Sequence, residues 1–138
     1  MAEFPRLVQT VIDATDVRRT AEFYRELFGL EYRPGDEPAD DPGADEVAWL
    51  VLRHPDGSGA LAFQHVDELQ PTTWPEPEVP MQLHLDCSVP DLDELRRQRA
   101  RAEALGATLR FDRSDDPDEP LFVMVDPEGH PFCLFVSA

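Results

Sequence analysis

Hydrophobic and polar positions follow two patterns in this chain, and each pattern occurs twice. A β-rich run over residues 7–15 ends at Asp16, and a second run over residues 81–90 ends at Asp91. After each Asp, apolar residues recur at the three- and four-residue spacing of an amphipathic helix. We therefore predict two strands, each followed by a helix.

Both predicted helices carry signals for where they begin and end. The first spans residues 17–28 and is followed by Gly29, a residue type that tolerates the left-handed conformation of a C-terminal cap. The second spans residues 92–105 and is followed by Gly106. Asp91, with a glutamate three residues later, resembles a capping box at its start.

The residues after each helix predict three further strands, the last two joined as a hairpin. Proline and glycine stand at matching offsets in the two hairpin turns, where they favour tight turns. The predicted elements are strands at 28–34, 47–53 and 60–66 with a turn at 54–57, then strands at 105–111, 121–125 and 132–136 with a turn at 126–129. The sequence therefore predicts an α+β protein of two βαβββ modules.

Two polar segments separate these elements. Residues 70–80 hold four prolines in eleven positions, which predicts a semi-rigid, extended linker. The acidic segment 34–45 is predicted to be mobile and solvent-exposed. Because 138 residues is the length of one domain, we predict a single domain with modules at about 5–68 and 81–137.

The charge balance narrows the range of partners. Twelve basic residues, all arginine, stand against 29 acidic ones, for a net charge of −17. Such a surface repels nucleic acid and anionic lipid, so we expect neither as a partner. Lysine and asparagine are absent, which favours a GC-rich bacterial genome. Salt adaptation is the other explanation for the acidity.

The sequence also bears on location. No apolar run approaches the roughly 20 residues of a membrane helix, and the N-terminus lacks the features of a signal peptide. We therefore expect a cytoplasmic protein. Cys87 and Cys133 are its two cysteines, and in that compartment we expect free thiols.

Several motifs resemble those of the vicinal oxygen chelate superfamily, which includes glyoxalase I, bleomycin-resistance and fosfomycin-resistance proteins, and extradiol dioxygenases. They are RRTAEFYRELFGLEY after Asp16, then AFQHV, HLDCSVPDLDEL, ALGA and DPEGHPFCLF. The resemblance covers residues 7–136. It implies that each module curls into a half-barrel, that paired modules enclose a cavity, and that the protein forms a homodimer.

The resemblance also implies where a metal would bind, because metal-dependent members place one ligand on the first and one on the last strand of each module. The matching positions are Gln9, Ala62, His84 and Cys133, with Gln64 as a polar alternative on the strand face of Ala62. Many metal-dependent members carry glutamate where this chain has Cys133.

This donor set is poor in the ligands that catalytic divalent ions prefer. One imidazole and one thiol remain, a pair that could favour zinc, and neutral amides fill the other positions. We therefore predict no catalytic metal. If a metal is bound, the predicted ligands are His84, Gln9, Gln64 and Cys133.

Two roles remain open for His84. It shares a strand face with Asp86, and it is either a structural histidine hydrogen-bonded to Asp86 or Gln9, or a ligand-contacting residue. Cys133 is interpreted as a small buried residue rather than a nucleophile. Cys87 faces the opposite side of the strand and is predicted to be core.

Two histidines and one tryptophan lie outside the predicted helices and strands. His54 and His130 lie in hairpin turns and are predicted to be exposed. Trp74 stands in the proline-rich linker, either packed on a sheet edge or acting as a lid over the cavity or a clasp on a partner subunit.

The sequence therefore predicts a glyoxalase-like protein that binds a small hydrophobic or aromatic ligand in the cavity between its modules, by sequestration as in bleomycin-resistance proteins. The alternative is a lyase, isomerase or dioxygenase that uses a weak metal site or His84. The predicted ligand contacts are Gln9, Gln64, His84, Asp86 and Cys133, with apolar walls from Trp49, Trp74 and Phe135. The exposed sheet edges of half-barrels also favour a homodimer.

Overall fold

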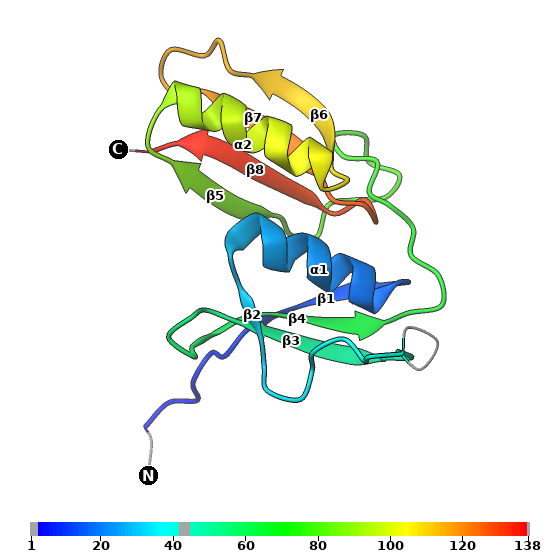
Figure 1. Ribbon diagram of the computed structural model, residues 1–138. Helices are drawn as coiled ribbons and strands as arrows, with labels where there is room; N and C mark the ends of the chain where they lie inside the picture. The colour runs from blue at the N-terminus through cyan, green and yellow to red at the C-terminus, as the bar shows by residue number, and fades with distance from the viewer. Residues whose placement is uncertain (1–2, 42–44, 138) are drawn as a thin grey trace. The chain divides into compact units, whose positions relative to one another are not determined.

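The computed structural model describes residues 3–41 and 45–137 and divides into two compact units (Figure 1). The first unit is Met1–Leu69 and the second is Gln70–Ala138. Each unit consists of a four-stranded sheet and one helix, in the predicted βαβββ order. The fold class is therefore α+β with two open sheets, as predicted.

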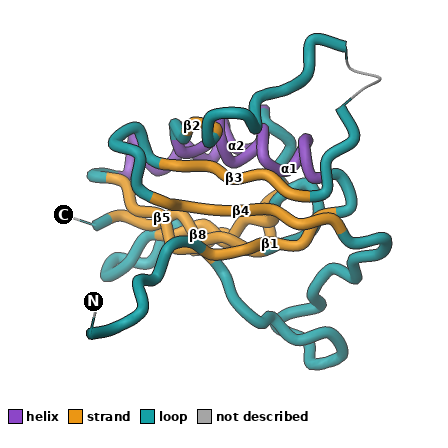
Figure 2. The backbone as a smooth tube through the Cα atoms, turned by 90° about the horizontal axis from the view of Figure 1, so that it is seen from below, coloured by secondary structure: helices purple, strands orange, loops and turns teal. Residues whose placement is uncertain are grey.

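The first unit begins with a strand that pairs with the unit's last strand. Its elements are β1 (Thr10–Ala14), α1 (Val17–Phe28), β2 (Glu31–Tyr32), β3 (Trp49–Arg53) and β4 (Gly59–His65). The strand order is β1-β4-β3-β2 (Figure 2). β1 is parallel to β4, and the β3–β4 hairpin is antiparallel.

The second unit repeats this topology. Its elements are β5 (Leu85–Val89), α2 (Leu92–Ala104), β6 (Thr108–Arg113), β7 (Leu121–Val125) and β8 (Pro131–Val136). The order β5-β8-β7-β6, with β5 parallel to β8, matches that of the first unit strand for strand. The repeat inferred from the sequence is thus confirmed.

The helix ends follow the predicted signals. Asp16 accepts a hydrogen bond from the Arg19 backbone N–H at 3.1 Å, and Gly29 ends α1 with a left-handed φ of 66°. At α2, Asp91 accepts from the Glu94 N–H at 2.8 Å. This helix ends at Ala104, one residue earlier than predicted.

The first strand of each unit is shorter than its apolar run suggests. Pairing with the last strand begins only at Thr10 in β1 and at Leu85 in β5. The residues before these points have no partner strand in the described sheets. Leu7, for example, is 93% exposed.

Each helix covers one face of its own sheet. In the first unit, the fully buried Tyr24 of α1 stacks on Phe63 of β4, with 5.8 Å between ring centroids. In the second unit, Phe132 and Met124 are fully buried, as is Leu95 of α2. We call the sheet face opposite the helix the distal face of each unit.

Segment 34–45 is exposed over most of its described residues, as predicted, whereas the predicted exposure of His130 is wrong. Residues 34–35 and 37–41 are exposed, while the Asp36 carboxylate accepts from the Val51 N–H at 3.0 Å and Asp45 pairs with Arg18. Residues 42–44 lie outside the described part of the chain. His130 in the second hairpin turn is 23% exposed, because its ring pairs with the buried Asp126 at 2.9 Å.

In the described residues, neither helix has the length and apolar character that a membrane-spanning segment requires.

Candidate functional site

Polar residues gather on the distal face of the first unit. Because Phe63 points toward α1, strand alternation places its neighbour Gln64 on the distal face. Gln64 is paired in register with Asp13 of β1 and Trp49 of β3. Its Nε2 donates to Asp13 Oδ1 at 2.6 Å. Gln64 and Trp49 therefore lie together, and Asp13, which was not among the predicted site residues, lies beside them.

The remaining predicted positions of the first unit fit the same alternation. Gln9 precedes β1 and is half-buried, and the period of two places it on the distal face with Asp13. Ala62, the other candidate ligand position, is fully buried and offers no donor atom. Gln64 is thus the polar side chain available on β4 at this face.

The distal face of the second unit brings three metal-ligating side chains together. Asp86 of β5 is paired in register with Cys133 of β8, and His84 lies two residues before Asp86. One donor atom from each of the three residues lies within 4.8 Å of the others. His84 Nε2 is 3.2 Å from Asp86 Oδ1. We call His84, Asp86 and Cys133 the donor cluster.

The two thiols differ in their surroundings. Burial raises the pKa of Cys87 to about 12, and Cys87 is paired with the buried Leu134 on the α2 side. Burial and the nearby Asp86 carboxylate also raise the pKa of Cys133. Since the thiolate is the reactive form, neither cysteine is set up as a nucleophile at neutral pH.

The linker places its tryptophan on the second unit. Trp74 meets Phe111 of β6 edge-to-face, with ring centroids 5.6 Å apart. Phe111 is paired in register with Val123 of β7, which is paired with Cys133, so Phe111 shares the distal face with the donor cluster. Phe135, two residues after Cys133 on β8, lies on this face as well.

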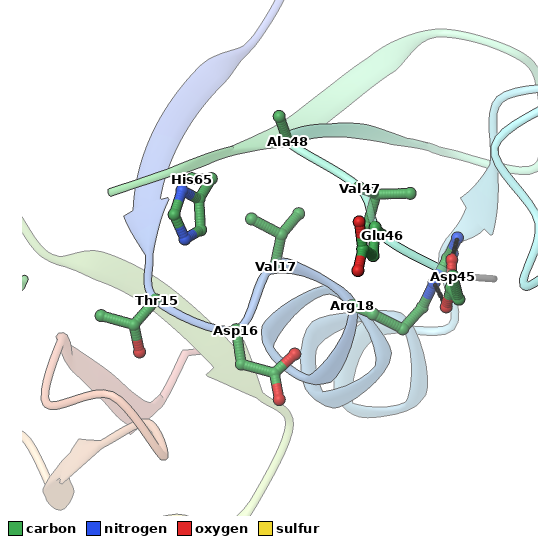
Figure 3. A pocket seen from close by; sticks show the side chains of 9 residues that line it. All are labelled: Thr15, Asp16, Val17, Arg18, Asp45, Glu46, Val47, Ala48 and His65. Carbon is green, nitrogen blue, oxygen red and sulfur yellow. Dashed lines mark hydrogen bonds and ion pairs between the residues drawn. The ribbon is translucent and has the colours of Figure 1, made fainter. Parts of the chain in front are cut away.

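A pocket of the first unit was not anticipated from the sequence. It has a volume of about 520 Å³ and lies where β1 leads into α1 (Figure 3). Its lining residues are Thr15, Asp16, Val17, Arg18, Asp45, Glu46, Val47, Ala48 and His65. None of them was among the predicted site residues. They come from three separate segments, which no local motif connects.

Arg18 forms one wall of this pocket and holds the segment before β3. Its Nε and Nη2 donate to the Asp45 carboxylate at 2.7 and 2.9 Å, and its Nη1 donates to the Asp36 carbonyl at 2.7 Å. The guanidinium lies over the Tyr32 ring, 5.0 Å from its centroid. The hydrogen bond from Arg18 lowers the pKa of Asp45. The pocket wall is thus an internal ion pair.

A comparison with protein families supplies the identity that this geometry suggests. The model of the glyoxalase-like domain family matches residues 9–135 of this sequence. The chain belongs to this family. A comparison with curated proteins finds no match.

Solved structures share the glyoxalase-like fold. A glyoxalase/bleomycin resistance protein/dioxygenase family enzyme from Burkholderia phytofirmans PsJN is 16% identical, with a TM-score of 0.66 over 94% of this chain and 97% of that chain. The fosfomycin resistance protein FosX from Listeria monocytogenes, complexed with Mn(II) and sulfate, is 17% identical, with a TM-score of 0.65 over 98% and 94%. The predicted membership of the vicinal oxygen chelate superfamily is confirmed.

The donor cluster of this glyoxalase-like protein fits a metal ion better than the residue set predicted from the sequence. Asp86 adds a carboxylate to the imidazole of His84 and the thiol of Cys133, and these three ligand types suit zinc. A bound divalent ion would act as a Lewis acid on a substrate oxygen. The signal was available in the sequence, because Asp86 stands two residues after His84 in the predicted β-rich run 81–90.

The sequence-based prediction that the candidate residues converge on one cavity involves residues of both units of the glyoxalase-like chain. Gln9, Trp49 and Gln64 belong to the first unit, and the donor cluster belongs to the second. Their convergence on one cavity stays a prediction.

Proposed function

We propose that this glyoxalase-like protein binds a small organic ligand on the distal face of its second unit, and that it does so without a catalytic metal. The donor cluster is the observation that carries the proposal. His84 is 37% exposed and Asp86 is 62% exposed, so their polar atoms are accessible rather than sealed in the core. The distal face beside them is apolar, with Val123 and Phe135. Apolar walls with a few polar groups are typical of ligand sites.

The proposal that no catalytic metal is bound rests on where the metal-ligating side chains lie. All three members of the donor cluster belong to the second unit, and His84 already pairs with Asp86 at 3.2 Å. The matching positions of the first unit offer an amide at Gln9 and a methyl group at Ala62. Gln64 is engaged with Asp13.

The first prediction tests ligand binding and metal content together. In protein purified without chelator, elemental analysis should find well below one equivalent of zinc, manganese, iron or nickel. In a panel of aromatic amines, alcohols and carboxylates followed by ligand-observed NMR, binders should lose about two- to tenfold in affinity on His84→Ala, the loss expected for one hydrogen bond. The melting temperature should change little, because His84 is partly exposed.

A metal-dependent enzyme is the second candidate, favoured by the clustering of three ligand types within 4.8 Å. In that case the protein would carry about one equivalent of metal, and both His84→Ala and Asp86→Asn would remove it. Asp115→Asn is the matched control, because it removes a carboxylate from an exposed loop position. Retention of metal in the Asp86 variant would assign the site to other ligands.

We also propose a cytoplasmic homodimer. β1 and β5 are edge strands of the two described sheets, and the segment before β1 exposes Phe4, Leu7 and Val8. Edge strands and exposed apolar side chains are commonly covered by a second chain. Light scattering at micromolar concentration should therefore give twice the mass of one chain, and Leu7→Asp should shift the population toward monomer. A monomer in the unmodified protein would contradict the proposal.

A further inference from the structure

We infer that Trp74 and Phe111 form the aromatic end of the ligand site in the second unit, and that the ligand joins an aromatic ring at this end to a cationic amine at the donor cluster. The inference rests on the proposed function and adds the chemical class and orientation of the ligand. It is drawn within the second unit alone.

The linker is folded back on itself and holds Trp74 in place, which differs from the extended conformation expected from its prolines. The Thr73 N–H donates to the Val79 carbonyl at 2.9 Å, and the Val79 N–H donates to Thr73 Oγ1 at 2.9 Å. Thr72 Oγ1 donates to the same carbonyl at 2.6 Å and accepts from the Trp74 N–H at 3.1 Å. These bonds close a compact loop around Trp74.

A bulge in β6 anchors this loop to the sheet. The register between β6 and β7 shifts between Leu109 and Phe111, which leaves Arg110 as an extra residue. A bulge of this kind redirects a side chain. Arg110 Nη1 donates to the backbone carbonyls of Trp74 at 2.9 Å and Thr72 at 3.3 Å. Arg110 is therefore a positioning residue for the indole of Trp74.

A single row of paired residues connects this anchored indole to the donor cluster. Asp86, Cys133, Val123 and Phe111 follow one another across β5, β8, β7 and β6. Three strand spacings of roughly 4.8 Å separate the ends of the row by about 14 Å. A molecule that contacts both ends must be elongated. Its middle would cross the half-buried Cys133 and pass above Val123, whose side chain is itself buried.

The charged side chains along this row set the orientation of the bound ligand. Arg113 lies over the Phe111 ring, 5.8 Å from its centroid, and Arg110 is bonded to the Trp74 carbonyl, so two guanidinium groups lie at the β6 end. At the β5 end, the Asp86 side chain is 62% exposed and can only accept hydrogen bonds when ionised. An amine is favoured at Asp86 and repelled at the aromatic end. The net charge of −17 attracts cations over a longer range.

The test uses 6-phenylhexylamine as the probe. Its comparison compounds are hexylamine, which lacks the ring, 6-phenylhexan-1-ol, which lacks the charge, and benzylamine, which is too short to reach both ends. Binding is followed by the indole N–H signals in ¹⁵N NMR, with the two tryptophans assigned by substitution. We expect 6-phenylhexylamine to bind about tenfold more tightly than each of the three and to shift the Trp74 signal.

Substitutions then test which residues bind each end of the probe. Trp74→Leu and Asp86→Asn should each weaken 6-phenylhexylamine about five- to tenfold, whereas Trp74→Phe should retain most of the affinity because it keeps an aromatic ring. Arg110→Met should weaken the phenyl compounds but not hexylamine. Asp115→Asn is the charge-matched control and should change nothing. Melting temperatures establish that each variant is folded.

Several outcomes would overturn the inference. If hexylamine binds as tightly as 6-phenylhexylamine, or if a folded Trp74→Leu variant keeps its affinity, Trp74 and Phe111 do not bind an aromatic ring of the ligand. If the alcohol binds as tightly as the amine, or if Asp86→Asn leaves the affinity unchanged, Asp86 does not recognise a cationic amine. Failure of every probe to bind would also reject the ligand class. The proposed function would survive any of these results if other ligands still bind in a manner that depends on His84.

Discussion

Phe63→Ala is expected to lower the free energy of unfolding by about 3–5 kcal/mol, the range for removing a large aromatic side chain from a core. Phe63 is fully buried between β4 and α1, and its ring stacks on Tyr24, which in turn contacts Phe23 and Phe28. The substitution would leave a cavity in the middle of this aromatic cluster. Urea titration followed by circular dichroism measures the loss.

Two control variants separate the cavity from other effects. Phe63→Leu keeps most of the side-chain volume and should cost about 1.5 kcal/mol or less. Trp49→Ala removes a larger side chain from the other face of the same sheet, where Trp49 is 38% exposed, and should cost less than Phe63→Ala. A cost for Trp49→Ala equal to that of Phe63→Ala would show that the core of the first unit is misassigned.

Asp126→Ala is expected to destabilise the protein by about 2–4 kcal/mol, because it leaves three part-buried donors without their fully buried acceptor. Asp126 Oδ1 accepts from the backbone N–H groups of Glu128 at 2.8 Å and His130 at 3.0 Å. Its Oδ2 pairs with His130 Nδ1 at 2.9 Å. The carboxylate side chain is completely buried, so water cannot replace it.

The first unit supplies the matched control for this turn. Asp56 Oδ1 accepts from the N–H and Oγ of Ser58 at 2.8 and 2.6 Å, but this turn is exposed. Because water can take over these bonds, Asp56→Ala should have a much smaller effect. Asp126→Asn keeps an acceptor oxygen and should fall between the two. Equal losses for Asp56→Ala and Asp126→Ala in thermal denaturation would refute the role of burial.

The features that could be predicted from the sequence are those encoded over a few residues. Asp16 and Gly29 mark the two ends of α1 because caps depend on local backbone geometry. A period of two likewise places His84 on the same side as Asp86, since this alternation is inherent in an extended chain.

The features that could not be predicted depend on contacts between distant segments. Arg18 and Asp45 are 27 residues apart, and no local pattern indicates that they pair. The bulge at Arg110 interrupts the strand alternation, so a period of two does not reveal where this side chain points. The contact between Trp74 and Phe111 depends on that bulge and on the folded linker.

The parallel pairing of the first and last strands in each unit has a consequence for synthesis on the ribosome. Thr10 is paired with Leu61, and Leu85 is paired with Phe132, so each sheet closes through residues about fifty positions apart. The β3–β4 and β7–β8 hairpins can form early, because their contacts are local. The first strand must wait, with its helix, until the hairpin has left the exit tunnel. The first unit can then close its sheet while the second is still being translated.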